Sequence, residues 1–266
     1  MNKIFAGIDI GSSRTKAVLL DNEKNIIGYS VRKSGSDFAG TAKLCLDDSL
    51  QKAGMDFGNI SATVSTGYGK SNVEYSDFVK TEISCHAKGC YHYFREAISV
   101  IDIGGQDNKI IKLDGGGKRI NFKMNRKCAA GTGAFLEEMA MRLDVPLEEM
   151  NSLAESSTEM VRIGSFCTVF SATEVLENIR MGKKVSDLAK GLFYSVIKRV
   201  LEMDKLEGKV IMTGGVVAYN PLLVKMTSEE LGEDVFVTPY PQLTGAIGAA
   251  LYALETVNEK IEVNNG

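Results

Sequence analysis

The sequence contains the same strand-turn-strand pattern twice, and this repeat constrains the fold more than any other feature. Residues 3–20 read KIFAGIDIGSSRTKAVLL and residues 98–113 read ISVIDIGGQDNKIIKL. In both segments Ile-Asp-Ile-Gly closes an apolar strand, small or polar residues form a turn, and a second apolar strand follows. The two aspartates, Asp9 and Asp102, are 93 positions apart (102 − 9). A β-hairpin repeated at this distance predicts two related lobes.

The rest of the chain mixes helical and strand patterns, which favours an α/β fold. Apolar residues recur every three or four positions in the predicted helices, so each has one face in a core. The strand at 209–212 ends at Thr213-Gly214-Gly215, a turn signal. The predicted strands outside the hairpins are 119–124, 209–212 and 234–237, and the predicted helices are 134–143, 185–201 and 244–254.

Composition excludes several classes of protein. Hydrophobic residues make up 44% of the 266 residues and charged residues 24%, which is enough apolar material for a core and argues against disorder. The formal net charge is −3 and no basic run is evident, so nucleic acid is not expected as a partner. The apolar N-terminal stretch is short and is interrupted by Asp9, and no later segment has the length of a membrane span. We therefore expect a cytoplasmic protein with no membrane partner.

The Asp-x-Gly turns have the chemistry of a phosphate site. Glycine lets the backbone approach a phosphate closely, and turn amides and hydroxyls donate hydrogen bonds to its oxygens. A carboxylate next to such a turn can hold Mg²⁺. One such turn is more often only a tight hairpin, but a matched pair followed by Gly214-Gly215 points to a nucleotide.

These three elements resemble the phosphate-1, phosphate-2 and adenosine motifs of the actin, sugar-kinase and heat-shock-chaperone ATPase superfamily. The resemblance implies two ribonuclease-H-like lobes with ATP and Mg²⁺ in the cleft, lobe I comprising 1–82 plus a C-terminal helix at 243–258, and lobe II comprising 83–242. No Walker A sequence is present. The implied catalytic residues are Asp9, Asp102 and Gln106, and the two aspartates are also the implied Mg²⁺ ligands. The implied nucleotide-binding residues are Gly11, Ser12, Ser13, Thr15, Lys16, Gly104, Gly105, Gly131, Gly133, Gly214 and Gly215.

Two of the five cysteines stand out. Cys128 and Cys167 each precede a helical pattern, and Ser171-x-x-Glu174 has the form of a capping box behind the second. A helix N-terminus stabilises a thiolate and hence a metal ligand. A 4Fe-4S cluster takes four thiolates, so two per chain would be half a site that a twofold-related copy completes. On chemistry alone, the favoured interpretation is that Cys128 is a small buried residue in a Gly/Ala-rich turn and Cys167 an ordinary apolar core position.

The sequences around these cysteines resemble the activator ATPases of 2-hydroxyacyl-CoA dehydratases and their benzoyl-CoA reductase relatives. The shared segments are Lys-Cys-Ala-Ala-Gly-Thr-Gly at 127–133, Cys-Thr-Val-Phe at 167–170, Thr-Gly-Tyr-Gly-Lys at 66–70, Glu-Ile-Ser-Cys-His-Ala-Lys-Gly at 82–89, both Asp-x-Gly turns, and Gly-Gly-Val at 214–216. The family commonly continues Ala-Glu-Ser-Glu-Val after the second cysteine, whereas this chain has Ser171-Ala-Thr-Glu-Val, so one carboxylate is missing.

The resemblance implies an ATP-dependent electron-transfer activator. Cys128 and Cys167 would hold a 4Fe-4S cluster shared across a homodimer, a ferredoxin or flavodoxin would reduce it, and the electron would pass to a partner iron–sulfur enzyme, a 2-hydroxyacyl-CoA dehydratase or a double-cubane-cluster reductase. A small-molecule kinase and an actin-like scaffold are the alternatives on the same fold, and neither requires the two cysteines. Cys45, Cys85 and Cys90 are expected to be core thiols, although Cys85 and Cys90 flank His86.

Overall fold

The computed structural model describes residues 3–164 and 167–265. The chain divides into two compact units, unit 1 being Met1–Arg95 with Leu243–Gly266 and unit 2 being Glu96–Gln242. Unit 1 therefore extends to Arg95, beyond the boundary at 82–83 expected from the sequence. Within the described residues, no helix combines the length and the hydrophobicity needed to cross a membrane.

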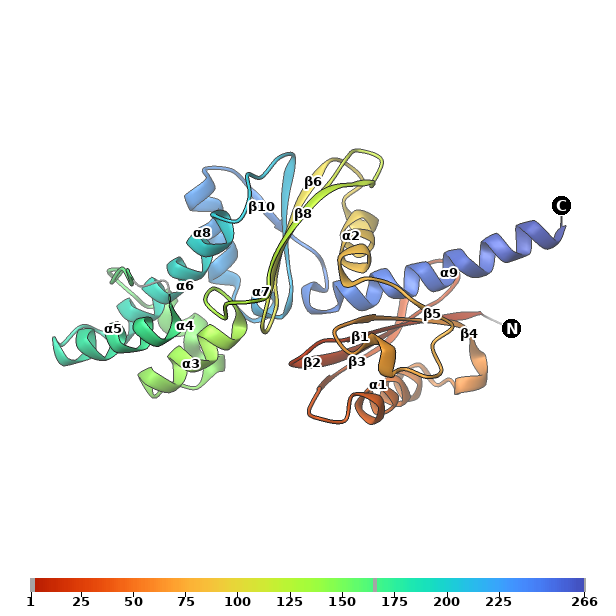
Figure 1. Cartoon of the computed structure of the whole chain (residues 1–266), viewed down its shortest axis with the longest axis horizontal. Helices are drawn as coiled ribbons and strands as arrows, with labels where there is room; N and C mark the ends of the chain where they lie inside the picture. Colours follow the sequence, from red (N-terminus) through yellow and green to blue (C-terminus); the bar gives the residue numbers. More distant parts are fainter. Residues whose placement is uncertain (1–2, 165–166, 266) are drawn as a thin grey trace. The chain divides into compact units, whose positions relative to one another are not determined.

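Unit 1 is a five-stranded sheet in the order β3-β2-β1-β4-β5 with helices on both faces (Figure 1). Alternate residues of β1 face opposite sides: Ile4, Ala6, Ile8 and Ile10 pack with α1, and Phe5 packs with α9. The elements of unit 1 are β1 (Ile4–Ile10), β2 (Arg14–Leu20), β3 (Ile26–Lys33), α1 (Phe38–Ala53), η1 (Phe57–Asn59), β4 (Ile60–Gly67), η2 (Lys70–Asn72), β5 (Phe78–Val79), α2 (Glu82–Tyr93) and α9 (Thr244–Asn265). A short 3-10 turn, η4 (Pro241–Leu243), enters α9.

Helix α9 lies against the sheet at a distance that only glycine allows. A Cβ at Gly7 would come within 2.0 Å of the Ala246 carbonyl oxygen, and one at Gly248 within 1.8 Å of the Cys85 carbonyl oxygen on α2. Side chains at either position would push the helix away from β1 or α2. The close approach makes α9 a core element of unit 1. The helix spans Thr244–Asn265, longer than the Ala-rich helix predicted at 244–254.

Unit 2 repeats the sheet, in the order β10-β9-β6-β7-β8, and adds a cluster of helices. Ile101, Ile103 and Ile110 of the sheet share one apolar core with α3, α6 and α8. The elements of unit 2 are β6 (Ile98–Ile103), β7 (Asn108–Leu113), β8 (Arg119–Asn125), α3 (Gly133–Leu143), η3 (Leu147–Glu149), α4 (Met150–Glu155), α5 (Thr168–Arg180), α6 (Val185–Leu201), β9 (Lys209–Thr213), α7 (Gly215–Tyr219), α8 (Pro221–Leu231) and β10 (Val235–Val237).

The register of the strands confirms the repeated hairpin. In unit 1, β1 pairs antiparallel with β2 and parallel with β4, which sets Asp9 opposite Lys16 and Thr66. In unit 2, β6 pairs antiparallel with β7 and parallel with β9, which sets Asp102 opposite Lys109 and Thr213. Each unit thus places one aspartate at the end of a central strand, between a hairpin partner and a parallel neighbour.

Candidate functional site

In unit 1 the aspartate of the first turn is buried and paired. Asp9 is 3% exposed, and the Lys16 ammonium donates to its Oδ2 at 3.0 Å. The turn that follows is closed by a hydrogen bond from the Gly11 amide to the Arg14 carbonyl at 3.1 Å. The Ser34 hydroxyl donates to the Gly11 carbonyl at 2.6 Å. The carboxylate is therefore held at the base of a closed turn by its ion pair with Lys16.

The candidate residues at the tip of this turn remain partly accessible. Ser12 and Ser13 are half-buried, whereas Thr15 is buried and its hydroxyl lies 3.0 Å from the Ser34 hydroxyl. The two serines can offer hydroxyls to a ligand, but Thr15 makes its polar contact inside the protein. Thr15 therefore supports the turn, and the sequence reasoning that grouped it with Ser12 and Ser13 did not separate these roles.

Unit 2 has the same arrangement with a deeper pair. Asp102 is 2% exposed and Lys109 is 1% exposed, and the ammonium lies 2.9 Å from Asp102 Oδ2 and 2.7 Å from Asp107 Oδ1. The Gly104 amide donates to the Asp107 carbonyl at 2.9 Å, which matches the closure of the first turn. Gln106 is exposed at the tip. The two turns therefore share both their backbone closure and their ion pair.

Lys109 was missed by the sequence reasoning, although a signal for it exists. Lys16 follows Asp9 by seven positions, and Lys109 follows Asp102 by seven positions. Only Lys16 was chosen as a candidate, although both lysines lie in the return strand of their hairpin. Extending the repeat past the turn into the return strand finds the second lysine.

A glycine at the end of the parallel neighbour approaches each aspartate. Gly67 has φ of 88° and Gly214 has φ of 103°, a backbone region that other residues rarely adopt. A Cβ at Gly67 would lie 2.5 Å from Asp9 Oδ1, and one at Gly214 would lie 2.5 Å from Asp102 Oδ1. Gly214 was a candidate and Gly67 was not. The structure gives them the same position relative to their aspartates.

Three hydrogen bonds join the second turn to the loop that carries Cys128. The amide of Gly133 donates to the Gly104 carbonyl at 2.9 Å, and that of Ala134 donates to the Gly105 carbonyl at 2.7 Å. The side-chain amide of Asn108, which is 1% exposed, donates to the Gly131 carbonyl at 2.8 Å. The candidates Gly104, Gly105, Gly131 and Gly133 are therefore one connected backbone structure. A displacement of the turn would be transmitted directly to the 128–134 loop.

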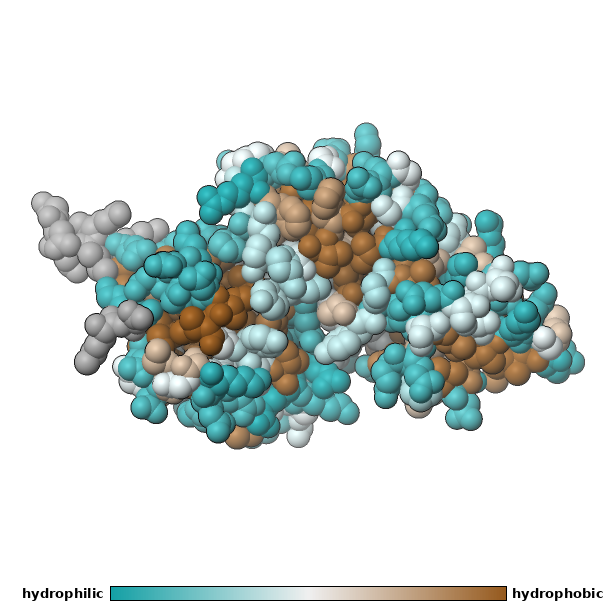
Figure 2. Space-filling model, turned by 180° about the vertical axis from the view of Figure 1, so that it is seen from behind, coloured by the Kyte–Doolittle hydropathy of each residue, from teal (hydrophilic) through white to brown (hydrophobic). Residues whose placement is uncertain are grey.

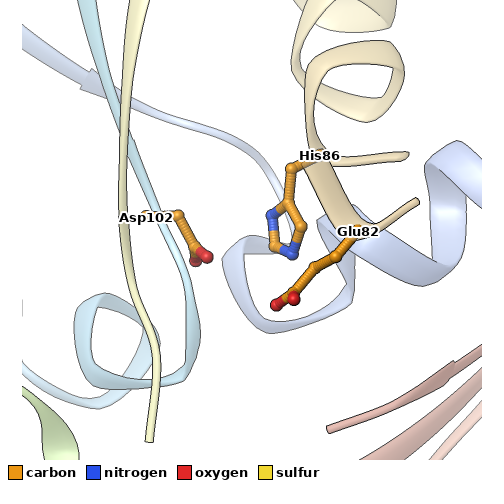
Figure 3. A group of neighbouring side chains, drawn as sticks. All are labelled: Glu82, His86 and Asp102. Atoms are coloured by element: carbon orange, nitrogen blue, oxygen red, sulfur yellow. The ribbon is translucent and has the colours of Figure 1, made fainter. Parts of the chain in front are cut away.

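The two singled-out cysteines are exposed, whereas Cys45, Cys85 and Cys90 are buried. Burial raises the pKa of the Cys85 thiol to about 12, so it stays protonated at neutral pH. The expectation that Cys45, Cys85 and Cys90 are core thiols agrees with their burial. Glu82 and His86, which lie one turn apart on α2, are drawn in Figure 3 together with Asp102 of β6.

The local setting of the exposed cysteines differs from the expectation in two respects. Cys167 is the N-cap residue of α5, and the Ser171 amide donates to its carbonyl at 2.8 Å. Ser171 therefore lies inside the helix, and the predicted capping box is wrong; Glu174 accepts instead from the Gly164 amide at 2.8 Å. Cys128 lies in a loop, because α3 starts at Gly133 after the N-cap Thr132. Cys167 therefore lies directly at a helix N-terminus, whereas Cys128 does not.

Comparison with known proteins gives matches over nearly the whole chain. The profile of the BadF/BadG/BcrA/BcrD ATPase family matches residues 6–253. The activator of lactoyl-CoA dehydratase from Anaerotignum propionicum is 44% identical over 257 residues, which cover 96% of this chain and 98% of the relative. Two solved structures are also similar. Component A of the (R)-2-hydroxyglutaryl-CoA dehydratase of Acidaminococcus fermentans is 37% identical with a TM-score of 0.91, and the match covers 96% of this chain and 99% of that chain. The activator of the 2-hydroxyisocaproyl-CoA dehydratase from Clostridium difficile with bound ADPNP is 38% identical with a TM-score of 0.91, and the match covers 98% of this chain and 97% of that chain.

A more distant structure bears on the fold alone. The ROK family glucokinase from Streptomyces griseus aligns with a TM-score of 0.58 at 14% identity, covering 95% of this chain and 99% of the glucokinase. Together with the two five-stranded sheets, this likeness confirms the predicted fold class of the actin and sugar-kinase type.

Proposed function

The chain belongs to the BadF/BadG/BcrA/BcrD ATPase family, and on this premise we propose that it is an ATP-dependent electron-transfer activator. Acting in the cytoplasm, it passes a low-potential electron from a 4Fe-4S cluster, shared by two copies of the chain, to a partner iron–sulfur enzyme. The partner class is a 2-hydroxyacyl-CoA dehydratase or a related double-cubane-cluster reductase. The support is that the similar proteins of Anaerotignum propionicum and Clostridium difficile are named as activators of such dehydratases.

The nucleotide site is assigned to the two turns. The two carboxylates are buried and each is paired with a lysine, and carboxylate oxygens are ligands that suit Mg²⁺. Asp9 and Asp102 would hold Mg²⁺, and Gln106 would orient the attacking water. The polar or glycine positions at 11–13, 16, 104, 105, 131 and 133 would surround the phosphates, and Gly214 and Gly215 would lie along the adenosine. When bound, Mg²⁺ would neutralise phosphate charge during hydrolysis.

The cluster is assigned to the exposed thiols. Cys128 and Cys167 are the two cysteines of the chain that are accessible to an external ligand. They supply two of the four thiolates that a 4Fe-4S cluster takes, so a second copy supplies the other two and the protein is a homodimer. When bound, the cluster would supply one electron at a time. Cys167, at the N-terminus of α5, and Cys128, in the loop before α3, would hold it.

The observation that carries the proposal is the connection inside unit 2. The turn assigned to a phosphate and the loop that bears Cys128 are joined through Asn108, Gly133 and Ala134. A kinase or a scaffold on this fold has no need for a phosphate turn bonded to a thiol loop. An activator does, because nucleotide must change the surroundings of the cluster if ATP is to drive the electron.

The surface next to Cys167 supports a protein partner. Val169 and Phe170 are 70% and 67% exposed, and Leu176 and Met181 are also exposed along α5. Figure 2 shows apolar surface, in brown, on the part of unit 2 that contains α5. Apolar side chains gathered on one exposed helix mark a protein contact. We assign this face to the second copy and to the partner enzyme.

The test is iron content after anaerobic purification. The parent protein should be brown and hold about four irons per dimer, as the cluster type requires. Cys128→Ala and Cys167→Ala should each lose the iron completely while the apo chain still folds. Cys45→Ala, at a buried thiol of unit 1, is the matched control and should keep it. Full iron in either exposed-site variant would refute the cluster assignment, whereas a parent protein without iron would favour the kinase alternative.

A further inference from the structure

The edge strand of unit 2 carries an unbalanced positive charge. Between residues 115 and 136 the sequence has five cations and no acidic residue, whereas the whole chain has a formal net charge of −3. The composition had suggested that positive charge is not concentrated anywhere, and this segment shows otherwise. The cations, which we name the basic edge, are Lys118, Arg119, Lys123, Arg126 and Lys127.

All five side chains of the basic edge face solvent. β8 is the last strand in the sheet order and pairs on one side with β7, so its other side has no neighbouring strand among the described residues. All five cations are exposed, and none forms a salt bridge with a carboxylate of residues 3–164 or 167–258, the part of the chain whose side chains the structure describes. The Arg119 guanidinium lies 5.3 Å from the centre of the Phe122 ring, which orders it on the surface. The positive charge is therefore available to an external partner.

The basic edge leads directly to Cys128. Arg126 and Lys127 immediately precede it, and the Asn125 side-chain amide, at the end of β8, donates to the Cys128 carbonyl at 3.2 Å. A partner bound to the strand would thus lie next to a proposed cluster ligand. Electron transfer between proteins requires such closeness, because the rate falls steeply with the distance between the two centres.

Resting on the proposed function, we propose that the basic edge is the docking surface of an acidic one-electron carrier protein that reduces the cluster. The carrier's centre loses one electron and the cluster gains it, with no bond made or broken. Complexes of redox carriers are small and short-lived, so charge complementarity rather than buried area sets how fast they form. The apolar face of α5 suits a longer-lived contact and is assigned above to other partners.

A simpler role for these cations is protection of the strand edge. Lysine and arginine on an edge strand prevent pairing with another sheet, and Ile120 and Phe122 are exposed there. Protection predicts that removing the charges causes aggregation but leaves the reduction rate of the soluble dimer unchanged. Docking predicts a slower rate in a protein that stays dimeric.

The experiment is anaerobic stopped-flow reduction of the oxidised holo-dimer by a reduced ferredoxin of net negative charge. The triple variant Arg119→Gln, Lys123→Gln, Arg126→Gln should lower the second-order rate constant about tenfold at low ionic strength. The difference should vanish at high salt, because exposed charges are screened. The matched control Lys183→Gln, Lys205→Gln, Lys225→Gln removes three exposed cations from other parts of unit 2 and should leave the rate near that of the parent.

A second reductant isolates docking from cluster chemistry. Reduced methyl viologen, a small cation, should reduce parent and variant at similar rates, since it needs no acidic docking surface. Equal slowing by both triple variants, or a parental rate in the first, would overturn the proposal. Loss of the viologen rate in the first variant would also overturn it, because the cluster itself would then be altered. A parent without iron would refute the proposed function instead.

Discussion

The two hairpins are the same structure with different supports. In each, a buried aspartate pairs with a lysine seven positions on, and a positive-φ glycine from the parallel neighbour touches the carboxylate. The supports differ at equivalent positions. The Gly11 carbonyl accepts from the hydroxyl of Ser34, which directly follows β3 of the same unit. The Gly104 carbonyl accepts from the amide of Gly133 at the start of α3.

The residue after the turn shows the same divergence. Thr15 and Asn108 occupy equivalent places in the repeat, 93 positions apart (108 − 15). The Thr15 hydroxyl contacts Ser34 within its own sheet, and the Asn108 amide donates to Gly131 in the loop with Cys128. Unit 1 thus has a self-contained turn, and unit 2 has a turn connected to a second site. Both exposed cysteines belong to unit 2, and all three buried ones belong to unit 1.

The largest effect should come from the feature that the hairpins share. Asp9→Asn and Asp102→Asn should each lower Mg²⁺-dependent ATP hydrolysis by about 10- to 100-fold, because each removes a charge proposed to hold or orient the metal. The measurement is the steady-state rate at saturating ATP. Asp21→Asn and Asp114→Asn, in turns outside the proposed site, should hydrolyse ATP like the parent. A large loss in only one of the two site variants would mean that the hairpins are not equivalent.

A smaller and more selective effect should come from the hydrogen bond of Asn108, which the first hairpin does not share. Asn108→Leu keeps the branched shape of the side chain, although it is bulkier, and leaves the Gly131 carbonyl without its donor, at a cost of about 1–3 kcal/mol. It should retain iron and ATP hydrolysis but reduce the change that Mg-ADPNP causes in the paramagnetic resonance signal of the reduced cluster. Thr15→Val, at the equivalent place in unit 1, should keep the full change. Equal loss in both variants would mean that the response is not carried by the unit 2 connection.

The comparison of Asn108→Leu with Thr15→Val requires that the parent protein itself responds to nucleotide. A ligand shifts a two-state equilibrium only through its differential affinity for the states. If saturating Mg-ADPNP left both the resonance signal and the accessibility of the cluster to an iron chelator unchanged in the parent dimer, the connection through Asn108 would have no signal to carry, and the electron-gating mechanism would fail.

Much of the fold was predictable because strand ends and turns have strong local signals. Ile-Asp-Ile-Gly predicted both hairpins, its repetition predicted two related lobes, and the resemblance of the three turns to the nucleotide motifs of a known superfamily predicted the fold class. The family resemblance, which is now confirmed, also rested on local motifs around Cys128 and Cys167. What the sequence did not reveal depends on contacts between segments distant in the chain: the approach of Gly67 to Asp9, and the bonds from Asn108 and Gly133 that join the second turn to the loop of Cys128.

The two errors arose because a local sequence pattern does not show where a residue lies in the fold. Ser171-x-x-Glu174 fits a capping box by composition, but the helix starts earlier, at Thr168, because Cys167 serves as its N-cap. The basic edge was overlooked because its cations are spaced by Ile120, Asn121, Phe122 and other neutral residues, so they form no run. Placing them on one exposed edge strand is what makes them a single surface.

The smallest effect should come from two adjacent glycines that the sequence treats alike. Gly214 has φ of 103°, and a Cβ there would lie 2.5 Å from Asp102 Oδ1 and 2.4 Å from the Ile103 carbonyl oxygen. Gly214→Ala should therefore lower the free energy of unfolding by about 1–3 kcal/mol and disturb the aspartate. A Cβ at Gly215 would meet only Gln242 Nε2, at 3.6 Å, so Gly215→Ala should unfold like the parent, within about 0.5 kcal/mol. Any weakening of ATP binding in Gly215→Ala, measured as Kd and expected to be a few-fold, then reports contact with the nucleotide rather than strain. An unchanged Kd would remove Gly215 from the proposed adenosine site, and the same loss of stability in both variants would contradict the difference between the two positions.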